Sequence, residues 1–87
     1  MTDQEKVDNI NIVLKTITDA LEKDMPSNKF TFESEYVNWS LRYILFKDGT
    51  RQDIIMSYDY VNDVILGLYP VSVLIEACKY ELERTDK

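Results

Sequence analysis

The 87-residue sequence predicts an α+β fold: an N-terminal helix, a three-stranded antiparallel β-meander, and one or two C-terminal helices packed on one face of the sheet. Near both ends of the chain, apolar residues recur at steps of three and four, which is the spacing of a helix with one buried stripe. In the middle, apolar and polar residues alternate around an Asp-Gly pair, the preferred centre of a tight hairpin. We expect residues 1–87 to form a single domain, because so short a chain has room for only one core.

The first helix is predicted to begin after Thr2 and to end near Met25. Thr2 and Glu5 have the spacing of a capping box, in which each side chain satisfies a backbone N–H at the start of the helix. Pro26 ends the helix, because proline disfavours helical geometry in the residue before it. The buried stripe, widened by its last two members, is predicted to contain Val7, Ile10, Leu14, Ile17, Leu21, Val13 and Ala20.

The first strand is predicted over residues 30–36. Phe30 and Phe32 point to one face, and Thr31, Glu33 and Glu35 point to the other, which is the period-two pattern of a half-buried strand.

The second and third strands are predicted over residues 39–46 and 51–58, joined by the Asp48-Gly49 turn. If Lys47 pairs with Thr50, the core face carries the opposed pairs Tyr43 and Ile54, Leu41 and Met56, and Trp39 and Tyr58. The opposite face carries Ser40, Arg42, Ile44, Phe46, Asp53, Ile55 and Ser57. Its three large hydrophobic residues exceed what a solvated face requires, so either another part of the chain or a partner covers them.

The C-terminal third begins with a stretch that admits two interpretations. Residues 60–66 fit a short helix capped by Asp59 and ended by Gly67, whereas residues 61–68 also fit an edge strand, so the type of the stretch 60–68 is left open. Pro70 then suits the first residue of a last helix. The buried stripe of that helix is predicted to contain Val71, Leu74, Ile75, Cys78 and Leu82.

Composition disfavours most catalytic and cofactor chemistry. The chain has no histidine, which excludes histidine-based triads and histidine metal ligands. Cys78 lies on an apolar stripe, and the two glycines do not form a phosphate-binding loop. The closest carboxylate pairs, Asp59 with Asp63 and Glu33 with Glu35, offer too few ligands for a metal site. We expect no enzyme activity, no cofactor and no metal.

The charge balance suggests a class of partner. Sixteen acidic and ten basic residues give a net charge of −6, which disfavours direct binding to nucleic acid or to an anionic membrane. No signal peptide or membrane-spanning run is recognisable, and a single cysteine gives no sign of an oxidising compartment, so a cytoplasmic location is expected.

One set of residues is predicted to bind a partner. No lysine or arginine occurs between Arg51 and Lys79, whereas carboxylates and tyrosines alternate there. Such a surface suits a basic protein, because tyrosine adds apolar contact and a hydroxyl at little entropic cost. The same residues would also serve as an ordinary solvated face. The predicted binding residues are Glu33, Glu35, Asp53, Asp59, Tyr60, Asp63 and Tyr69.

The sequence therefore predicts a small acidic, non-enzymatic protein-binding domain. An inhibitor that occludes a basic site on its partner fits best. In one form of this inhibition, carboxylates stand in for phosphates at a nucleic-acid-binding site, although the moderate net charge of −6 speaks against extreme mimicry. Phage anti-restriction and anti-CRISPR inhibitors are examples of this class, and the comparison rests on size and charge alone. The alternative is an assembly module that forms a homodimer through an apolar sheet surface or a tyrosine-rich surface.

Overall fold

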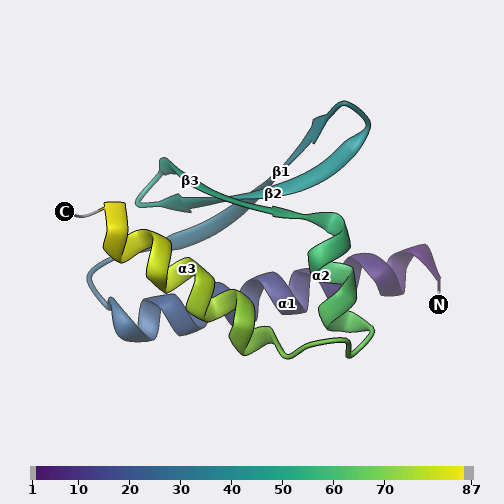
Figure 1. Ribbon diagram of the computed structural model, residues 1–87, viewed down its shortest axis with the longest axis horizontal. Coiled ribbons are helices and arrows are strands. Elements are labelled where there is room, and N and C mark those ends of the chain that lie inside the picture. The colour runs from purple at the N-terminus through teal and green to yellow at the C-terminus, as the bar shows by residue number, and fades with distance from the viewer. Residues whose placement is uncertain (1, 86–87) are drawn as a thin grey trace.

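The computed structural model describes residues 2–85 and confirms the predicted α+β arrangement (Figure 1). The elements in chain order are α1 (Asp3–Asp24), β1 (Phe30–Val37), β2 (Ser40–Lys47), β3 (Thr50–Ser57), α2 (Tyr58–Ile65) and α3 (Val71–Thr85). The strands form one antiparallel sheet in the order β1-β2-β3. All three helices lie on one side of this sheet, and the β1–β2 hairpin projects beyond them (Figure 1).

Helix α1 begins and ends where its sequence signals predict. Thr2 is the N-cap, and its hydroxyl accepts from the Glu5 N–H at 3.2 Å. The Glu5 carboxylate accepts from the Thr2 hydroxyl, also at 3.2 Å, rather than from the backbone N–H of Thr2 that a capping box uses. Of the predicted stripe, Val7 is half-exposed because it faces an open depression beside β1 and β2. The fully buried residues of α1 are Ile10, Val13, Ile17 and Leu21.

The core lies between the helices and the predicted face of the sheet. Phe30, Tyr43, Leu45, Ile54 and Met56 are buried in one cluster with residues of all three helices. Partly buried side chains packed against that cluster include Phe32, Leu41 and Tyr58. The assignment of the core face is therefore confirmed for the strand residues except Trp39, and Tyr58 packs against the core as the first residue of α2 rather than from the predicted strand.

The register of the second hairpin differs from the prediction. Lys47 pairs with Thr50 as expected, but Tyr43 lies opposite Met56 rather than Ile54, and Leu41 has no partner on β3. The cause is an irregularity between Ile44 and Phe46, where β2 has one residue and β3 has the three residues 52–54. Because β3 gains two residues relative to β2, and two is one full period of a strand, every side chain keeps its face.

Trp39 is not a strand residue, which corrects its predicted place opposite Tyr58. Val37 pairs with Ser40, so Asn38 and Trp39 form the two-residue turn between β1 and β2. The prediction placed this loop one residue too early, at residues 37–38. As a result Trp39 leaves the core face for the tip of the hairpin, where its side chain is 100% exposed.

Residues 58–65 form a helix, which resolves the ambiguity over the stretch 60–68 for most of its length. The N-cap is Ser57, whose hydroxyl accepts from the Tyr60 N–H at 3.2 Å, so the prediction that Asp59 caps the helix is wrong. Asp59 instead lies in the first turn, where its charge complements the helix dipole. Gly67 follows the helix with a φ of 80°, the left-handed conformation predicted for it.

Helix α3 packs obliquely across α1 and runs in the same general direction, with Lys79 of α3 paired to Asp24 at the end of α1 at 3.2 Å (Figure 1). Leu74, Cys78 and Leu82 are buried, and Val71 and Ile75 are partly buried against the same core. Pro70 precedes the helix, and its carbonyl accepts from the Val73 N–H at 3.1 Å.

Candidate functional site

The predicted acidic residues of β1 lie on the outer face of the sheet, where basic residues accompany them. Glu33 lies opposite Ile44, and Glu35 lies opposite Arg42. The Glu35 carboxylate also lies 3.5 Å from the Arg51 guanidinium of β3. Exposed ion pairs of this kind contribute little to stability. They do offset the charge of the carboxylates, so this face presents a mixed surface rather than an acidic one.

The apolar residues of the outer face are partly covered by the sheet itself. Ile44 is only 2% exposed, although it does not belong to the main core cluster. It lies on the central strand between Glu33 and Ile55, whose side chains flank it. Ile55 on the edge strand remains 46% exposed. The excess hydrophobicity seen in the sequence is thus largely accounted for within the sheet.

Asp53 is separated from the carboxylates of β1. It belongs to β3, the opposite edge strand, within the irregular segment. There it lines a depression between β3 and α3, together with Ala77 and Glu81. The structure therefore does not gather Glu33, Glu35 and Asp53 into one patch.

The remaining predicted residues do come together, on α2 and the segment that follows it. The Tyr69 hydroxyl donates to the Tyr60 carbonyl at 3.0 Å, and the two rings meet edge-to-face with centroids 6.2 Å apart. Burial, and then the carboxylate of Asp63, raise the pKa of Tyr69 above its usual value. Asp59 lies one helical turn before Asp63 and is exposed. These four residues form one acidic and aromatic surface on α2.

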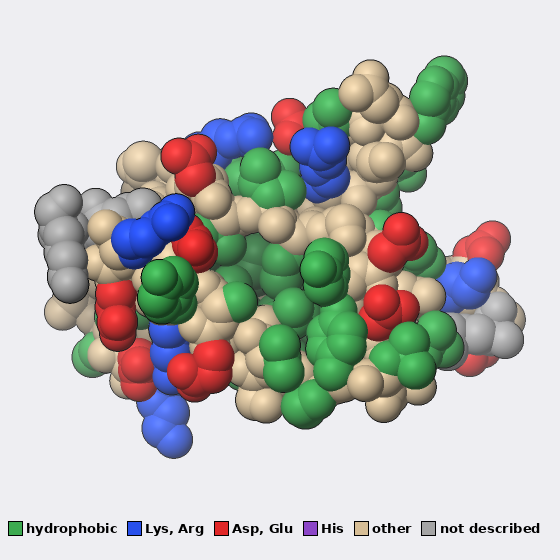
Figure 2. Space-filling view, in the orientation of Figure 1, with side chains coloured by type: hydrophobic (Ala, Val, Ile, Leu, Met, Phe, Trp, Pro, Cys, Tyr) green, Lys and Arg blue, Asp and Glu red, His purple; other side chains and the backbone are tan. Residues whose placement is uncertain are grey.

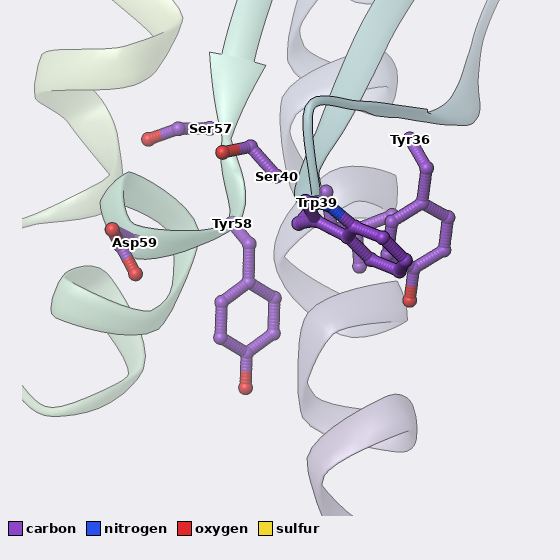
Figure 3. A pocket seen from close by; sticks show the side chains of 7 residues that line it. Tyr36, Trp39, Ser40, Ser57, Tyr58 and Asp59 are labelled. Atoms are coloured by element: carbon purple, nitrogen blue, oxygen red, sulfur yellow. The ribbon is translucent and has the colours of Figure 1, made fainter.

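A second aromatic group, which the sequence prediction did not include, lies where the β1–β2 hairpin extends past the end of β3. It reaches from Tyr58, beside the end of β3, to Trp39 in the turn of the hairpin. β3 ends at Ser57 and the chain turns into α2, whereas β2 continues to Ser40. The step between them is an open depression of about 360 Å³ (Figure 3). Its lining residues, which we call the hairpin-root site, are Tyr36, Trp39, Ser40, Leu41, Ser57, Tyr58 and Asp59.

Trp39 is held in a conformation that bulky residues rarely adopt. Its φ is 66°, in the left-handed region, and the preceding Asn38 has a φ of 51°. Two successive positive φ values are the pattern of a type I′ hairpin turn. Asparagine tolerates this region, but a tryptophan there costs roughly 1–2 kcal/mol relative to a relaxed backbone. The chain thus places its single tryptophan on a strained turn, in full contact with solvent.

Tyrosines continue the aromatic surface from the hairpin-root site toward α1. Burial, and then the neighbouring hydroxyls of Tyr58 and Tyr36, raise the pKa of Tyr43. All three tyrosines line an adjacent depression of about 430 Å³, which also contains Asp3 and Lys6 of α1. Tyr36 contributes to both depressions and is 74% exposed.

A signal for the Asn38-Trp39 turn, though not for the whole site, was present in the sequence, because an asparagine lies between two alternating segments. Asn38 can occupy a left-handed position almost as readily as the aspartate of an Asp-Gly turn. The tryptophan in second place concealed the turn, because that position usually holds glycine.

Two observations concern possible ligands and nucleophiles in the described residues. Within residues 2–85, no three potential ligands among histidine, cysteine, aspartate and glutamate gather as a metal site would require. Burial raises the pKa of the Cys78 thiol to about 11, so it stays protonated at neutral pH and is a poor nucleophile.

No protein-family model matches this chain, and no curated protein or solved structure is significantly similar to it. None of the helices in the described part of the chain is both long enough and apolar enough to cross a membrane.

Proposed function

We propose that this chain is a non-enzymatic protein-binding domain that docks onto a partner with a basic surface. The observation that supports it is Trp39, which is fully exposed at the tip of a strained hairpin turn. Folding gains nothing from an exposed tryptophan in a left-handed conformation. Tryptophan and tyrosine are the residues most enriched among those that dominate protein–protein binding energies. Figure 2 shows hydrophobic side chains projecting from the end of this hairpin, clear of the body of the molecule.

The charge of the chain suggests a basic partner and an inhibitory mode of action. The net charge is −6, and residues 52–78 contain aspartates and a glutamate but no lysine or arginine. This segment supplies Ser57, Tyr58 and Asp59 of the hairpin-root site and the acidic surface of α2. Long-range attraction would guide such a surface to a positively charged site, including one that binds nucleic acid, and would then block it.

The test begins with affinity capture of the tagged chain at about 0.1 M and about 0.5 M salt. We expect a basic protein to be retained at low salt, and we expect its binding to be weaker at high salt. Two charge-reversal variants of the chain then locate the contact on that purified protein. Asp59→Lys with Asp63→Lys should weaken binding strongly, whereas Glu33→Lys with Glu35→Lys should weaken it less, because arginines already offset the second pair. Binding that is equal at both salts and in both variants would contradict a charge-guided interaction.

A second candidate function is self-association, and a separate apolar surface favours it. Figure 2 shows hydrophobic side chains gathered over the α2–α3 connection. Ile12 of α1 and Leu68 of the connection are each more than 60% exposed and line a groove of about 580 Å³ with Tyr69 and Pro70. Sedimentation at both salt concentrations tests this candidate. An apolar dimer would persist at high salt, and Leu68→Asp would dissociate it without unfolding the chain.

A further inference from the structure

We propose that the hairpin-root site receives an arginine side chain from the surface of the basic partner. This inference rests on the proposed function and names the group that the site recognises. Three features of the lining residues fit an arginine: their aromatic faces, their hydrogen-bond acceptors and their charge.

Aromatic side chains supply most of the walls of the site. Figure 3 shows Trp39 and Tyr36 on the hairpin side and Tyr58 between them and α2. The faces of such rings attract cations, and tryptophan does so most strongly. A guanidinium group is planar, so it can stack on a ring while its edge remains free to donate hydrogen bonds.

The opposite wall supplies acceptors for those donors. Asp59 lines the site from the first turn of α2, and its carboxylate is exposed to solvent. Ser40 adds a hydroxyl oxygen at the edge of the sheet, and the Ser57 hydroxyl, which caps α2 by accepting from the Tyr60 N–H, lies beside it. The chain from residue 39 to residue 41 also has no β3 partner, since the last ladder pair joins Arg42 to Ser57. Arginine has five N–H donors and no acceptor, so this set of groups matches it.

The charge of the site selects a cation over an anion. Among the described residues that line it, Asp59 alone is charged at neutral pH, and no lysine or arginine takes part. Two basic side chains occur near the site but do not line it. Lys6 lines the adjacent depression, and Arg42 lies opposite Glu35 on the outer face. An incoming arginine would therefore enter the site without meeting a like charge on its walls.

Trp39 is the single tryptophan of the chain, so its fluorescence reports on this site alone. The experiment titrates the protein with hexa-arginine and, separately, with hexa-lysine at about 0.1 M salt. Hexa-arginine should shift the Trp39 emission to the blue in a saturable manner and protect it from acrylamide. Hexa-lysine, which has the same charge but no planar group, should bind about two- to five-fold more weakly.

Variants separate stacking at this site from general attraction. Tyr36→Ala and Asp59→Asn change exposed side chains and should each weaken hexa-arginine binding about two- to five-fold. Tyr80→Ala is the matched control, because Tyr80 is an exposed tyrosine in the C-terminal half of α3, and it should leave binding unchanged. Circular dichroism tests whether each variant is folded. If Tyr36→Ala is unfolded, the affinity of Asp59→Asn for hexa-arginine tests the site instead.

Three results would overturn the inference. The first is an equal response to hexa-arginine and hexa-lysine, and the second is wild-type binding by both site variants. The third is saturation by tetramethylammonium without a response to hexa-arginine, which would identify a small quaternary ammonium ligand. If a captured basic protein binds in a salt-dependent manner while hexa-arginine leaves Trp39 unaffected, the arginine site is wrong and the proposed function stands. If no basic protein binds, the proposed function fails whatever the peptides do.

Discussion

The two hairpin turns of this sheet share a backbone and differ in what that backbone holds. In the β2–β3 turn, Asp48 and Gly49 have φ values of 52° and 80°. In the β1–β2 turn, Asn38 and Trp39 have φ values of 51° and 66°. Both pairs are left-handed, as a two-residue turn between twisted antiparallel strands requires. Only the second turn places a bulky side chain where glycine is preferred.

The two turns also differ in how many contacts they make with the rest of the molecule. The Asp48 carboxylate accepts from the Lys29 N–H at 2.8 Å and from the Asn28 side-chain amide at 2.7 Å, and the Asp48 N–H donates to the Lys29 carbonyl at 2.8 Å. This turn is therefore tied to the segment between α1 and β1. The β1–β2 turn projects freely, with Trp39 fully exposed (Figure 1). One turn is bonded to a neighbouring segment of the fold, whereas the other has a bulky residue at positive φ whose side chain is left exposed.

The largest expected effect is on partner binding by the β1–β2 turn. Trp39→Ala should reduce affinity for the captured basic protein by roughly 30-fold or more, as removal of a central aromatic anchor does. Its melting temperature should stay at the wild-type value, because the side chain has no buried contact to lose. Titration calorimetry measures the affinity, with Tyr80→Ala as the control. Wild-type affinity in Trp39→Ala would show that the β1–β2 turn does not contribute to partner binding.

Gly49→Ala should produce the next largest effect, a loss of roughly 1–2 kcal/mol in the free energy of unfolding. A Cβ at this position meets no atom within 4 Å, so the cost comes from the φ of 80° alone. Urea denaturation measures the change. A synthetic chain with D-alanine at position 49 is the control and should retain wild-type stability, since a D-residue favours positive φ. An equal loss in both chains would point to a steric cause instead.

Trp39→Gly should stabilise the fold by about 0.5–1 kcal/mol while weakening partner binding as much as Trp39→Ala does. Glycine relieves the left-handed strain, and its greater freedom in the unfolded chain offsets part of that gain. Asn38→Gly should gain less, because asparagine already tolerates this conformation. Denaturation midpoints of the two variants supply the measurement, and a destabilised Trp39→Gly would show that the indole stabilises the hairpin.

The smallest expected effect is on the pH dependence of stability, through the carboxylate of Asp48. The hydrogen bonds from the Lys29 N–H and then from Asn28 hold the pKa of Asp48 below its usual value of 3.8. Because the folded-state pKa is lowered, the stabilisation is complete above the usual value and is lost as the pH falls through the lowered one. Asp48→Asn should therefore be less stable than wild type at neutral pH and should lose less stability below about pH 4. Parallel pH dependences for the two proteins would mean that the carboxylate charge contributes nothing.

The contrast between the turns also explains which parts of the fold could be predicted. The Asp-Gly pair, the Thr2 cap, Pro26 and the left-handed Gly67 act within a few residues, and all of them were identified from the sequence. The faces of the strands were identified too, because the period of two survives a register shift of two. The Asn38-Trp39 turn was missed by one residue, and that single step moved Trp39 from the expected core to the hairpin tip.

The candidate site was predicted in part. Asp59, Tyr60, Asp63 and Tyr69 lie together because they share α2 and its following segment, so short-range spacing sufficed. Glu33, Glu35 and Asp53 required knowledge of the sheet, and there the arginines and the irregular segment of β3 intervene. The hairpin-root site joins Tyr36 and Trp39 to Tyr58 and Asp59, across about twenty residues of sequence. It exists because β3 ends before β2 does, which no local pattern specifies.

By itself, the sequence determined the order of the elements, the type of each one except the stretch 60–68, most of the inward-facing residues, and the absence of histidine chemistry. Those properties follow from local propensity and periodic burial, which act over a few residues. The tertiary structure alone decided the β2–β3 register, the cap at Ser57 and the exposure of Trp39. Each of these depends on how one strand is placed against another. The energy of pairing two distant segments depends on both segments together, so it cannot be inferred from the local sequence of either one.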